Sequence, residues 1–223
     1  MATINIRGDI VGNDDKWIYD WFDMDATCPK DVTDIIQAAE EGEEIEVLIN
    51  SGGGSVWAGQ EIYSALAKSR NVIIRIQSLA GSAAGVVAMA GHSIISPVAM
   101  IMIHNVSLSG ASGDYHDMQK NAEILKQMNA AMASAYTRKS GRPLDEILKL
   151  MDKETWLTAN QCLDYGFVDE IETGQQSVVY TNSYSGMWLT DEIRQKAMEQ
   201  RAEKEAREEE KKQLLEDLDL YGV

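Results

Sequence analysis

The chain has 223 residues, of which 44% are hydrophobic and 25% charged, and its formal net charge is −16 at pH 7. This length and composition are typical of one sizeable globular core with an appendage. The negative charge argues against a nucleic-acid-binding surface, and no segment is apolar for long enough to span a bilayer. Since the N-terminal residues also lack the apolar core of a signal peptide, we expect a cytoplasmic protein that binds neither nucleic acid nor membrane.

The cysteines and histidines show no metal-ligand spacing. Cys28 and Cys162 make no disulfide framework, which is typical of a reducing compartment. His92, His104 and His116 do not combine with cysteine into a zinc pattern. The sequence therefore predicts neither a metal nor a cofactor.

The first part of the chain predicts two strands around a helix. Residues 3–6 alternate like a short strand, and residues 45–49 form a compact apolar run that is typical of another. Between them, apolar side chains at helical spacing begin at Pro29, a favourable first helical residue, and end before Gly42. The aromatic-rich residues 17–24 predict no definite conformation.

The middle of the chain alternates strands and helices. Helices are expected over residues 56–69 and 82–90, with strands at 72–76, near 94–95 and at 100–103. Strands that alternate with helices imply a largely parallel sheet with right-handed crossovers. The expected fold class is therefore α/β.

The next part is mainly helical. A long helix fits residues 115–139, and a shorter one fits residues 144–151. A capping box at residues 158–161 opens a helix that ends at Gly166, and residues 167–171 predict a final strand. The long helix carries an apolar face made of Met118, Ala122, Leu125, Met128, Ala131 and Ala135.

The composition changes after residue 173. Residues 174–185 are polar, and residues 189–220 are dominated by Glu, Lys, Arg and Gln, with too few apolar side chains to bury themselves alone. We therefore expect a globular domain over residues 1–173. Residues 174–223 are expected to form a linker and a charged tail that is helical or partly disordered.

Ser82 and His104 form the first candidate pair. Ser82 stands among small residues where a strand is expected to turn into a helix, and His104 directly follows the strand at 100–103. Histidine is the usual base that removes a serine proton near neutral pH, which favours a nucleophile and its general base. The opposing interpretation is a helix N-cap and a strand-edge histidine, because the nucleophile-elbow motif requires glycine where this chain has Ala80 and Ala84.

Three successive glycines at residues 52–54 form a second candidate site. The backbone there is expected to turn tightly, to adopt positive φ and to expose its N–H groups. A phosphate cradle is one interpretation, but neither the Walker pattern nor the dinucleotide fingerprint is present. The favoured interpretation is an oxyanion hole, in which the N–H groups of Gly54 and Ala83 stabilise a tetrahedral intermediate.

Several segments match one protein family in the right order. They are residues 49–54 (I-N-S-P-G-G in the family, with Gly52 replacing the proline), 81–83 (usually Ala-Ser-Met), 102–104 (M-I-H), 157–159 (L-S-A) and 164–169 (E-Y-G-L-V-D). Over roughly residues 4–171, the chain thus resembles the Clp peptidase (ClpP) family of serine proteases, in the ClpP/crotonase superfamily. This resemblance implies a spiral of βα units with a mostly parallel sheet and a long handle-type helix.

The resemblance also implies roles for the candidate residues. Ser82 would be the nucleophile and His104 the general base, beside the oxyanion hole described above. The family places an Asp two residues before the aromatic residue of its F-L-S-A segment, and the corresponding residue here is Glu154. Asp152 is the alternative acid. A carboxylate is wanted there because it holds the imidazole in one tautomer and stabilises its charged form.

The charged tail resembles those of ClpP-like enzymes of tailed phages and prophages, which process capsid and scaffold proteins in the prohead. Few residues precede Ile4, where relatives that dock an unfoldase carry an axial loop, and no ATP-binding motif is present. We therefore expect an ATP-independent serine endopeptidase that forms a homo-oligomeric ring or stacked rings, in the host cytoplasm or the phage prohead. The alternatives are a catalytically weak or inactive ClpP-like assembly scaffold and a crotonase-type acyl-CoA enzyme.

Overall fold

The computed structural model describes residues 1–173 of the chain. These residues belong to one compact unit, Met1–Gln175. The predicted linker and charged tail, at residues 174–223, lie outside the described residues. Within residues 1–173, no helix is both long enough and apolar enough to cross a membrane.

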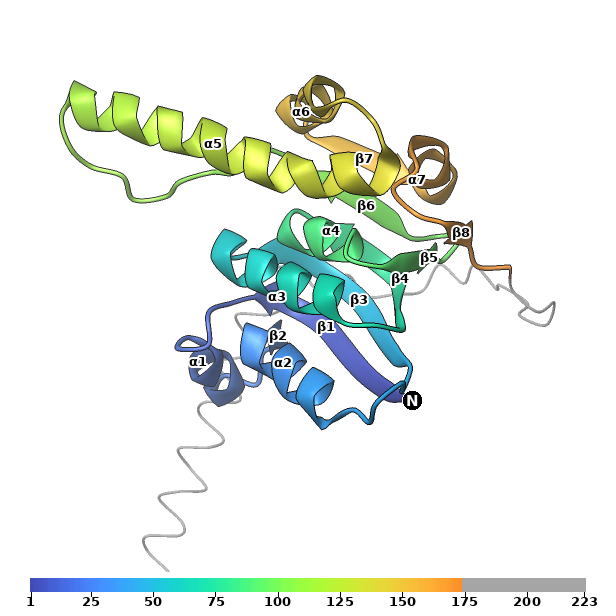
Figure 1. Ribbon diagram of the computed structural model, residues 1–223. Coiled ribbons are helices and arrows are strands. Elements are labelled where there is room, and N and C mark those ends of the chain that lie inside the picture. Colours follow the sequence, from blue (N-terminus) through green and yellow to red (C-terminus); the bar gives the residue numbers. More distant parts are fainter. Residues whose placement is uncertain (174–223) are drawn as a thin grey trace, which may run out of the picture. The chain divides into compact units, whose positions relative to one another are not determined.

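A sheet of eight strands forms the centre of this unit (Figure 1). Six strands lie in the order β2 (Ala26–Thr27), β1 (Ala2–Ile10), β3 (Ile45–Gly54), β4 (Val72–Gly81), β5 (His92–Ile95) and β8 (Glu170–Ile171). Off this path, β6 (Met100–Ile103) pairs with β4, and β7 (Thr155–Thr158) pairs with β6. Every pairing is parallel except that of β6 with β7. The predicted α/β fold with a mostly parallel sheet is confirmed.

Strand β4 divides its pairing between two neighbours. Residues 73–76 pair with β5, whereas the last part of β4 pairs with β6, with Gly81 opposite Met102. The carboxyl ends of β4 and β6 therefore lie side by side. Ser82 follows β4 directly and His104 follows β6, so the topology brings both residues to the same edge of the sheet, where open α/β sheets place their ligands.

Helices cover one face of the sheet, and the side chains of β3 that point toward that face are buried. Along β3, Ile45, Val47 and Ile49 are buried and the residues between them are less so. Helices α2 (Pro29–Ala38), α3 (Val56–Lys68) and α4 (Ala83–Ala88) lie in front of β1, β3 and β4 in Figure 1. All residues of α4 are buried, which fixes the helix that starts beside Ser82.

The long helix α5 (Tyr115–Ser140) is buried in its C-terminal half. Its buried residues are Met132, Ala133, Ala135 and Tyr136, and Figure 1 shows the other half extending beyond the strands. Of the predicted apolar face, Met118 in the first half of the helix is exposed, whereas Ala135 in the second half is buried. The buried part of α5 begins at Met132, one position after the predicted Ala131, and the helix packs against α6 and α4.

Two shorter helices complete the described chain. Helix α6 (Leu144–Asp152) is amphipathic and buries Ile147 and Met151. Helix α7 (Ala159–Tyr165) opens with the predicted capping box, in which the Thr158 N–H donates a hydrogen bond of 3.0 Å to Gln161 Oε1. It ends at Gly166, whose φ of 75° is a left-handed C-cap, as the sequence predicts.

Three elements were not predicted. Helix α1 (Lys16–Trp21) and strand β2 occupy the aromatic-rich region and its end, and β7 pairs antiparallel with β6. Helix α1 has no buried residue and β2 has two residues, so neither leaves a clear periodic pattern. Strand β8 is also shorter than the predicted strand at 167–171.

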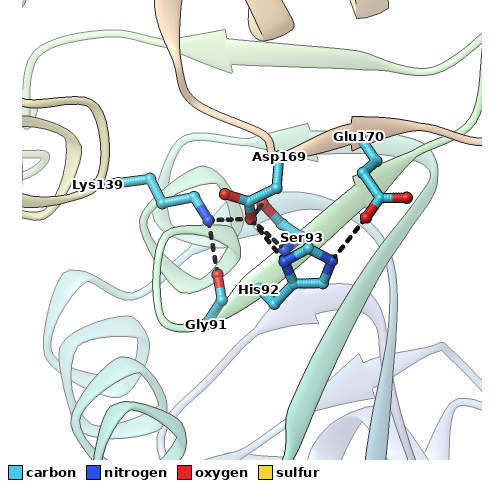
Figure 2. Close-up of polar contacts among 6 residues, drawn as sticks. All are labelled: Gly91, His92, Ser93, Lys139, Asp169 and Glu170. Atoms are coloured by element: carbon cyan, nitrogen blue, oxygen red, sulfur yellow. Dashed lines mark hydrogen bonds and ion pairs between the residues drawn. The ribbon is translucent and has the colours of Figure 1, made fainter.

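A polar cluster joins the end of α5 to the sheet (Figure 2). Lys139 forms an ion pair with Asp169 and donates a hydrogen bond of 2.8 Å to the Gly91 carbonyl oxygen. Asp169 also accepts a bond of 2.7 Å from the Ser93 N–H, and His92 Nδ1 lies 3.4 Å from the same carboxylate oxygen. Burial alone would raise the pKa of Asp169, but the bonds from Lys139 and Ser93 outweigh burial and hold this pKa below its ordinary value.

Candidate active site

Ser82 occupies a sharp turn between β4 and α4. Its φ of 52° and ψ of −120° are unusual for a residue with a side chain, and such strain is common at functional sites. The turn is held by two backbone bonds: the Ser82 N–H donates to Met102 O at 2.8 Å, and the Val86 N–H donates to Ser82 O at 3.2 Å. The strained strand-to-helix turn of a nucleophile elbow is thus present without its usual sequence motif.

Glycines allow this turn to lie against its neighbours. A Cβ on Gly81 would stand 3.0 Å from the Gly52 carbonyl oxygen, and a Cβ on Gly85 would stand 2.4 Å from Tyr136 Oη. The nucleophile-elbow motif would place glycines at positions 80 and 84. This chain has alanine at both positions and glycine one position later, at Gly81 and Gly85. Each removes a side chain where another segment approaches the turn.

His104 lies beside Ser82. Its Nε2 is 2.8 Å from Ser82 Oγ, which is a hydrogen-bond distance. With the imidazole proton on Nδ1, Nε2 accepts this bond and is placed to take the serine proton. The structure therefore brings together the two side chains that the sequence selected, although they are 22 positions apart.

The structure does not bring either candidate acid into contact with His104. Glu154 Oε1 accepts a long bond of 3.4 Å from Trp156 Nε1, and Asp152 Oδ1 accepts a bond of 2.8 Å from Asn105 Nδ2. Among residues 1–173, the His104 imidazole is bonded to Ser82 and to neither carboxylate. The third member of the triad stays a prediction.

The backbone places the two acids differently beside β7. Ile103 is paired with Thr155 at the end of the antiparallel ladder of β6 and β7, and His104 and Glu154 each adjoin this last pair. Glu154 lies in the turn before β7 with a left-handed φ of 48°, so the ladder does not continue through it. Asp152 is the last residue of α6.

The two amides of the predicted oxyanion hole lie in adjacent segments. Ala83 is the first residue of α4, so its N–H has no partner within the helix. The backbone nitrogen of Ala83 would lie 2.9 Å from a Cβ on Gly53. The glycines at the end of β3 therefore approach the start of α4 closely. Gly53 and Gly54 have the predicted positive φ, with values of 102° and 145°, whereas Gly52 has none. The predicted tight turn is wrong, because residues 52–54 are the last part of β3 and Gly53 and Gly54 pair with β1.

A cavity of about 320 Å³ opens beside Ser82 and His104. Gly54 lines it together with side chains from α3, α4, α5 and α6, and most of its wall is apolar. The predicted apolar face of the long helix includes neither of the two wall residues from α5. Met132 and Tyr136 have helical spacing and could have been selected as a pair, but this pair is shifted from the apolar face that was chosen.

No metal site accompanies this pair in the part of the chain that the structure describes. Residues 1–173 contain no group of three or more His, Cys, Asp or Glu side chains that could hold a metal ion. Both cysteines are buried, and burial raises the pKa of Cys162 to about 12, so this thiol is protonated at neutral pH. Cys162 is therefore poorly suited to act as a nucleophile.

Comparison with known proteins identifies the family. The family model described as Clp protease matches residues 29–175. The chain is 31% identical over 143 residues to ATP-dependent Clp protease proteolytic subunit 2 of Tropheryma whipplei (strain Twist), covering 62% of this chain and 79% of that protein. It is 30% identical over 140 residues to the ATP-dependent Clp protease proteolytic subunit of Porphyromonas gingivalis, covering 61% and 63%.

A third relative shows the same coverage of the chain. The chain is 31% identical over 142 residues to ATP-dependent Clp protease proteolytic subunit 1 of Leifsonia xyli subsp. xyli, covering 61% of this chain and 72% of that protein. The family match contains the glycines at the end of β3, Ser82, His104 and both candidate acids. The chain therefore belongs to the Clp protease family and is a peptidase of the Clp type.

Proposed function

We propose that the chain is a serine endopeptidase in which Ser82 is the nucleophile and His104 the general base. The observation that carries this proposal is the distance of 2.8 Å between Ser82 Oγ and His104 Nε2 beside an open cavity. Ser82 Oγ attacks the carbonyl carbon of a peptide bond while His104 takes the hydroxyl proton. The carbonyl π electrons move to oxygen, and the amides of Gly54 and Ala83 stabilise the resulting oxyanion.

The same residues complete the reaction. His104 gives its proton to the leaving amine as the C–N bond breaks, which leaves an acyl group on Ser82. Water then attacks this ester with His104 again as base, and His104 returns the proton to Ser82 Oγ as the bond between Oγ and the acyl carbon breaks and the carboxylic acid leaves. Glu154 is the proposed orienting carboxylate, because it directly precedes Thr155, whose partner Ile103 directly precedes His104. Asp152 is the alternative.

We propose further that the chain forms homo-oligomeric rings. The N-terminal half of α5 supports this proposal, since Met118 and Ile124 are large apolar side chains left exposed there. Peptide cleavage itself is proposed to need no ATP, because the mechanism above uses none and the sequence has no Walker motif. The relatives compared above are named as proteolytic subunits of ATP-dependent proteases. Peptide cleavage that requires an added ATP-dependent unfoldase would therefore contradict the proposal.

The proposed substrates are capsid or scaffold proteins of a phage, cut during prohead maturation in the host cytoplasm. The support is the likeness of the charged tail at residues 189–220 to those of phage ClpP-like enzymes. Co-expression with the phage capsid and scaffold proteins tests this role. Truncation of either protein by the wild type and not by Ser82→Ala is expected, whereas intact proteins in both samples would contradict it.

A fluorophosphonate probe tests the chemistry directly, because it reacts with an activated serine. We expect labelling of the wild type at Ser82 and none in Ser82→Ala or His104→Ala. Ser134→Ala is the matched control, since Ser134 is exposed on α5 and its hydroxyl bonds to the Ala131 carbonyl oxygen. An assembled, folded wild type that remains unlabelled would favour an assembly scaffold or a crotonase-type acyl-CoA enzyme.

A further inference from the structure

Helix α1 presents large apolar side chains to solvent. Trp17 and Trp21 are 65% and 78% exposed, and Ile18, Phe22 and Met24 are exposed as well. The helix buries none of its residues. Trp17 and Trp21 are four positions apart, so they lie on one side of the helix, with Ile18 and Phe22 beside them. Apolar surface that gathers in this way marks an interaction site.

Polar contacts hold this helix to its neighbours. The Tyr19 hydroxyl donates a hydrogen bond of 3.1 Å to Asp9 Oδ2 in β1, and the Met24 N–H donates one of 2.9 Å to Tyr19 O. Just before the helix, Asn13 Oδ1 accepts a bond of 2.9 Å from the Lys30 N–H in α2. The apolar face of α1 is therefore presented at a defined place.

Helix α1 stands at the edge of the sheet where the candidate active site lies. Ile10, the last residue of β1, pairs with Gly54, the last residue of β3, and residues 11–15 connect β1 to α1. Figure 1 shows α1 beyond the end of β1. Gly54 also lines the cavity beside Ser82. A polypeptide that contacts α1 can therefore extend along this edge toward Ser82.

Acidic side chains flank the apolar face along the chain. Exposed aspartates occupy several positions between residues 14 and 25: Asp14, Asp15, Asp20, Asp23 and Asp25. The one basic residue of this stretch is Lys16, which forms an ion pair with Asp20. A partner that carries lysine or arginine beside apolar side chains therefore complements the surface in both polarity and charge.

The same charge disfavours other occupants. Residues 214–223 of this chain contain four leucines, but their charged residues are Glu216, Asp217 and Asp219, so the aspartates around α1 repel them. A second copy of the chain brings a net charge of −16 to the contact. An anionic lipid surface is repelled for the same reason. The favoured occupant is a basic segment of another protein.

We propose that the apolar face of α1 is a docking surface for the protein substrates. A substrate segment in which apolar side chains alternate with lysine or arginine binds to Trp17, Trp21 and Phe22, while a neighbouring part of the same polypeptide reaches Ser82. Because this contact does not touch the reacting atoms, it lowers KM and leaves kcat unchanged. The docking role rests on the proposed function, since Ser82 must cut the docked polypeptide.

Fluorogenic peptides that share one cleavable segment and differ in an extension test the proposal. The first extension combines leucine, phenylalanine and lysine; the second has glutamate in place of lysine, and the third has serine in place of leucine and phenylalanine. For the wild type we expect the first extension alone to raise kcat/KM, by about tenfold and through KM. This gain should shrink between about 0.01 M and about 1 M salt, because salt screens the aspartates.

Two variants of α1 locate the effect. Trp17→Ala and Trp21→Ala should each remove most of the gain and keep the wild-type kcat/KM for the peptide without an extension. Both should fold, because α1 buries no residue. Val98→Ala is the matched control, since Val98 is 77% exposed and lies between β5 and β6, which the strand order separates from β1 by β3 and β4. It should keep the whole gain.

Several outcomes overturn the docking surface while the proposed function stands. One is cleavage that depends on Ser82 but gains nothing from the first extension, or a gain that both tryptophan variants keep. Another is a smaller oligomer of Trp17→Ala or Trp21→Ala in sedimentation, because α1 would then be an interface between copies. Inhibition of the wild type by a peptide of residues 214–223 would assign the surface to this chain's own C-terminal segment.

A binding measurement separates the two proposals in the opposite case. If no peptide is cleaved in a Ser82-dependent way, the proposed function is overturned. Fluorescence anisotropy of the labelled first extension with Ser82→Ala then shows whether α1 binds such a segment at all. Binding that is lost when Trp21→Ala is added to Ser82→Ala supports the docking surface, and binding that is absent or unchanged overturns it.

Discussion

Gly53 lies directly against Ser82: a Cβ built on this glycine would stand 2.7 Å from Ser82 Cβ and 2.9 Å from the Ala83 nitrogen. Its φ of 102° is also a conformation that other residues rarely adopt. The glycines at the end of β3 and the strained serine turn therefore pack directly against each other. A side chain at Gly53 would press on Ser82 and on the Ala83 nitrogen, which is one of the proposed oxyanion donors.

We therefore predict that Gly53→Ala abolishes most of the peptidase activity, with a loss in kcat of about 10²-fold or more, as expected when an oxyanion donor is displaced. Gly52→Ala is the matched control, because a Cβ on Gly52 meets nothing within 4 Å and its φ is not positive. Peptide hydrolysis and probe labelling measure the effect. Equal activities of the two variants would contradict the proposed role of Gly53.

The antiparallel pairing of β6 with β7 leads to a prediction for the triad acid. Since Glu154 directly precedes Thr155, the partner of Ile103 at the end of this ladder, Glu154→Gln should lower kcat by about 10²–10⁴-fold, because the imidazole loses its orienting charge. Asp152→Asn should cost far less, since Asp152 is bonded to Asn105. Single-turnover acylation of a fluorogenic ester measures both variants. A larger loss in Asp152→Asn would assign the acid to Asp152 instead.

The sequence predicts local structure well where one residue controls it. Pro29 begins α2, the capping box opens α7, and Gly166 ends it, because each signal acts through bonds within one turn of chain. Strand β7 was missed because Leu157 is its one buried residue, and its position depends on pairing with β6. Pairing partners distant in sequence leave little local pattern.

Some features of the candidate site could be predicted from the sequence and others could not. Ser82 and His104 were selected from residue type and from their places after two strands, and the strand order brings them within hydrogen-bond distance. The orientation of Glu154 and the cavity wall at Tyr136 were not predicted. A side-chain rotamer and the packing of α5 depend on tertiary contacts that the sequence pattern does not contain.

Gly85 and Tyr136 should be energetically coupled. A Cβ on Gly85 would stand 2.4 Å from Tyr136 Oη and 3.1 Å from the Ala80 carbonyl oxygen, so Gly85→Ala should lower the free energy of unfolding by about 1–3 kcal/mol. Tyr136→Phe removes the nearer atom, so the double variant should recover part of this loss. Urea denaturation of the wild type, both single variants and the double variant measures the coupling. Strictly additive effects would show that the hydroxyl does not press on Gly85.

Asp169 should make the fold sensitive to acid. Because its folded-state pKa lies below the ordinary value of 3.8, its interactions contribute stability that is fully present above that value. This contribution is lost as pH falls below 3.8 and through the folded-state pKa, since the protonated acid no longer pairs with Lys139. The carboxylate is partly exposed, so its contribution at neutral pH should be about 1 kcal/mol after solvent screening.

The variant Asp169→Asn tests the predicted direction of this pH dependence of stability. At pH 7 the variant should unfold at a lower urea concentration than the wild type, and the difference should shrink as pH is lowered from 5 to 3. Asp145→Asn is the control, because its partner Lys149 lies four residues away on the exposed face of α6 and the pair is strongly solvated. A difference between wild type and Asp169→Asn that stays constant from pH 7 to pH 3 would show that the cluster around Lys139 stabilises the fold through packing and not through the charge of Asp169.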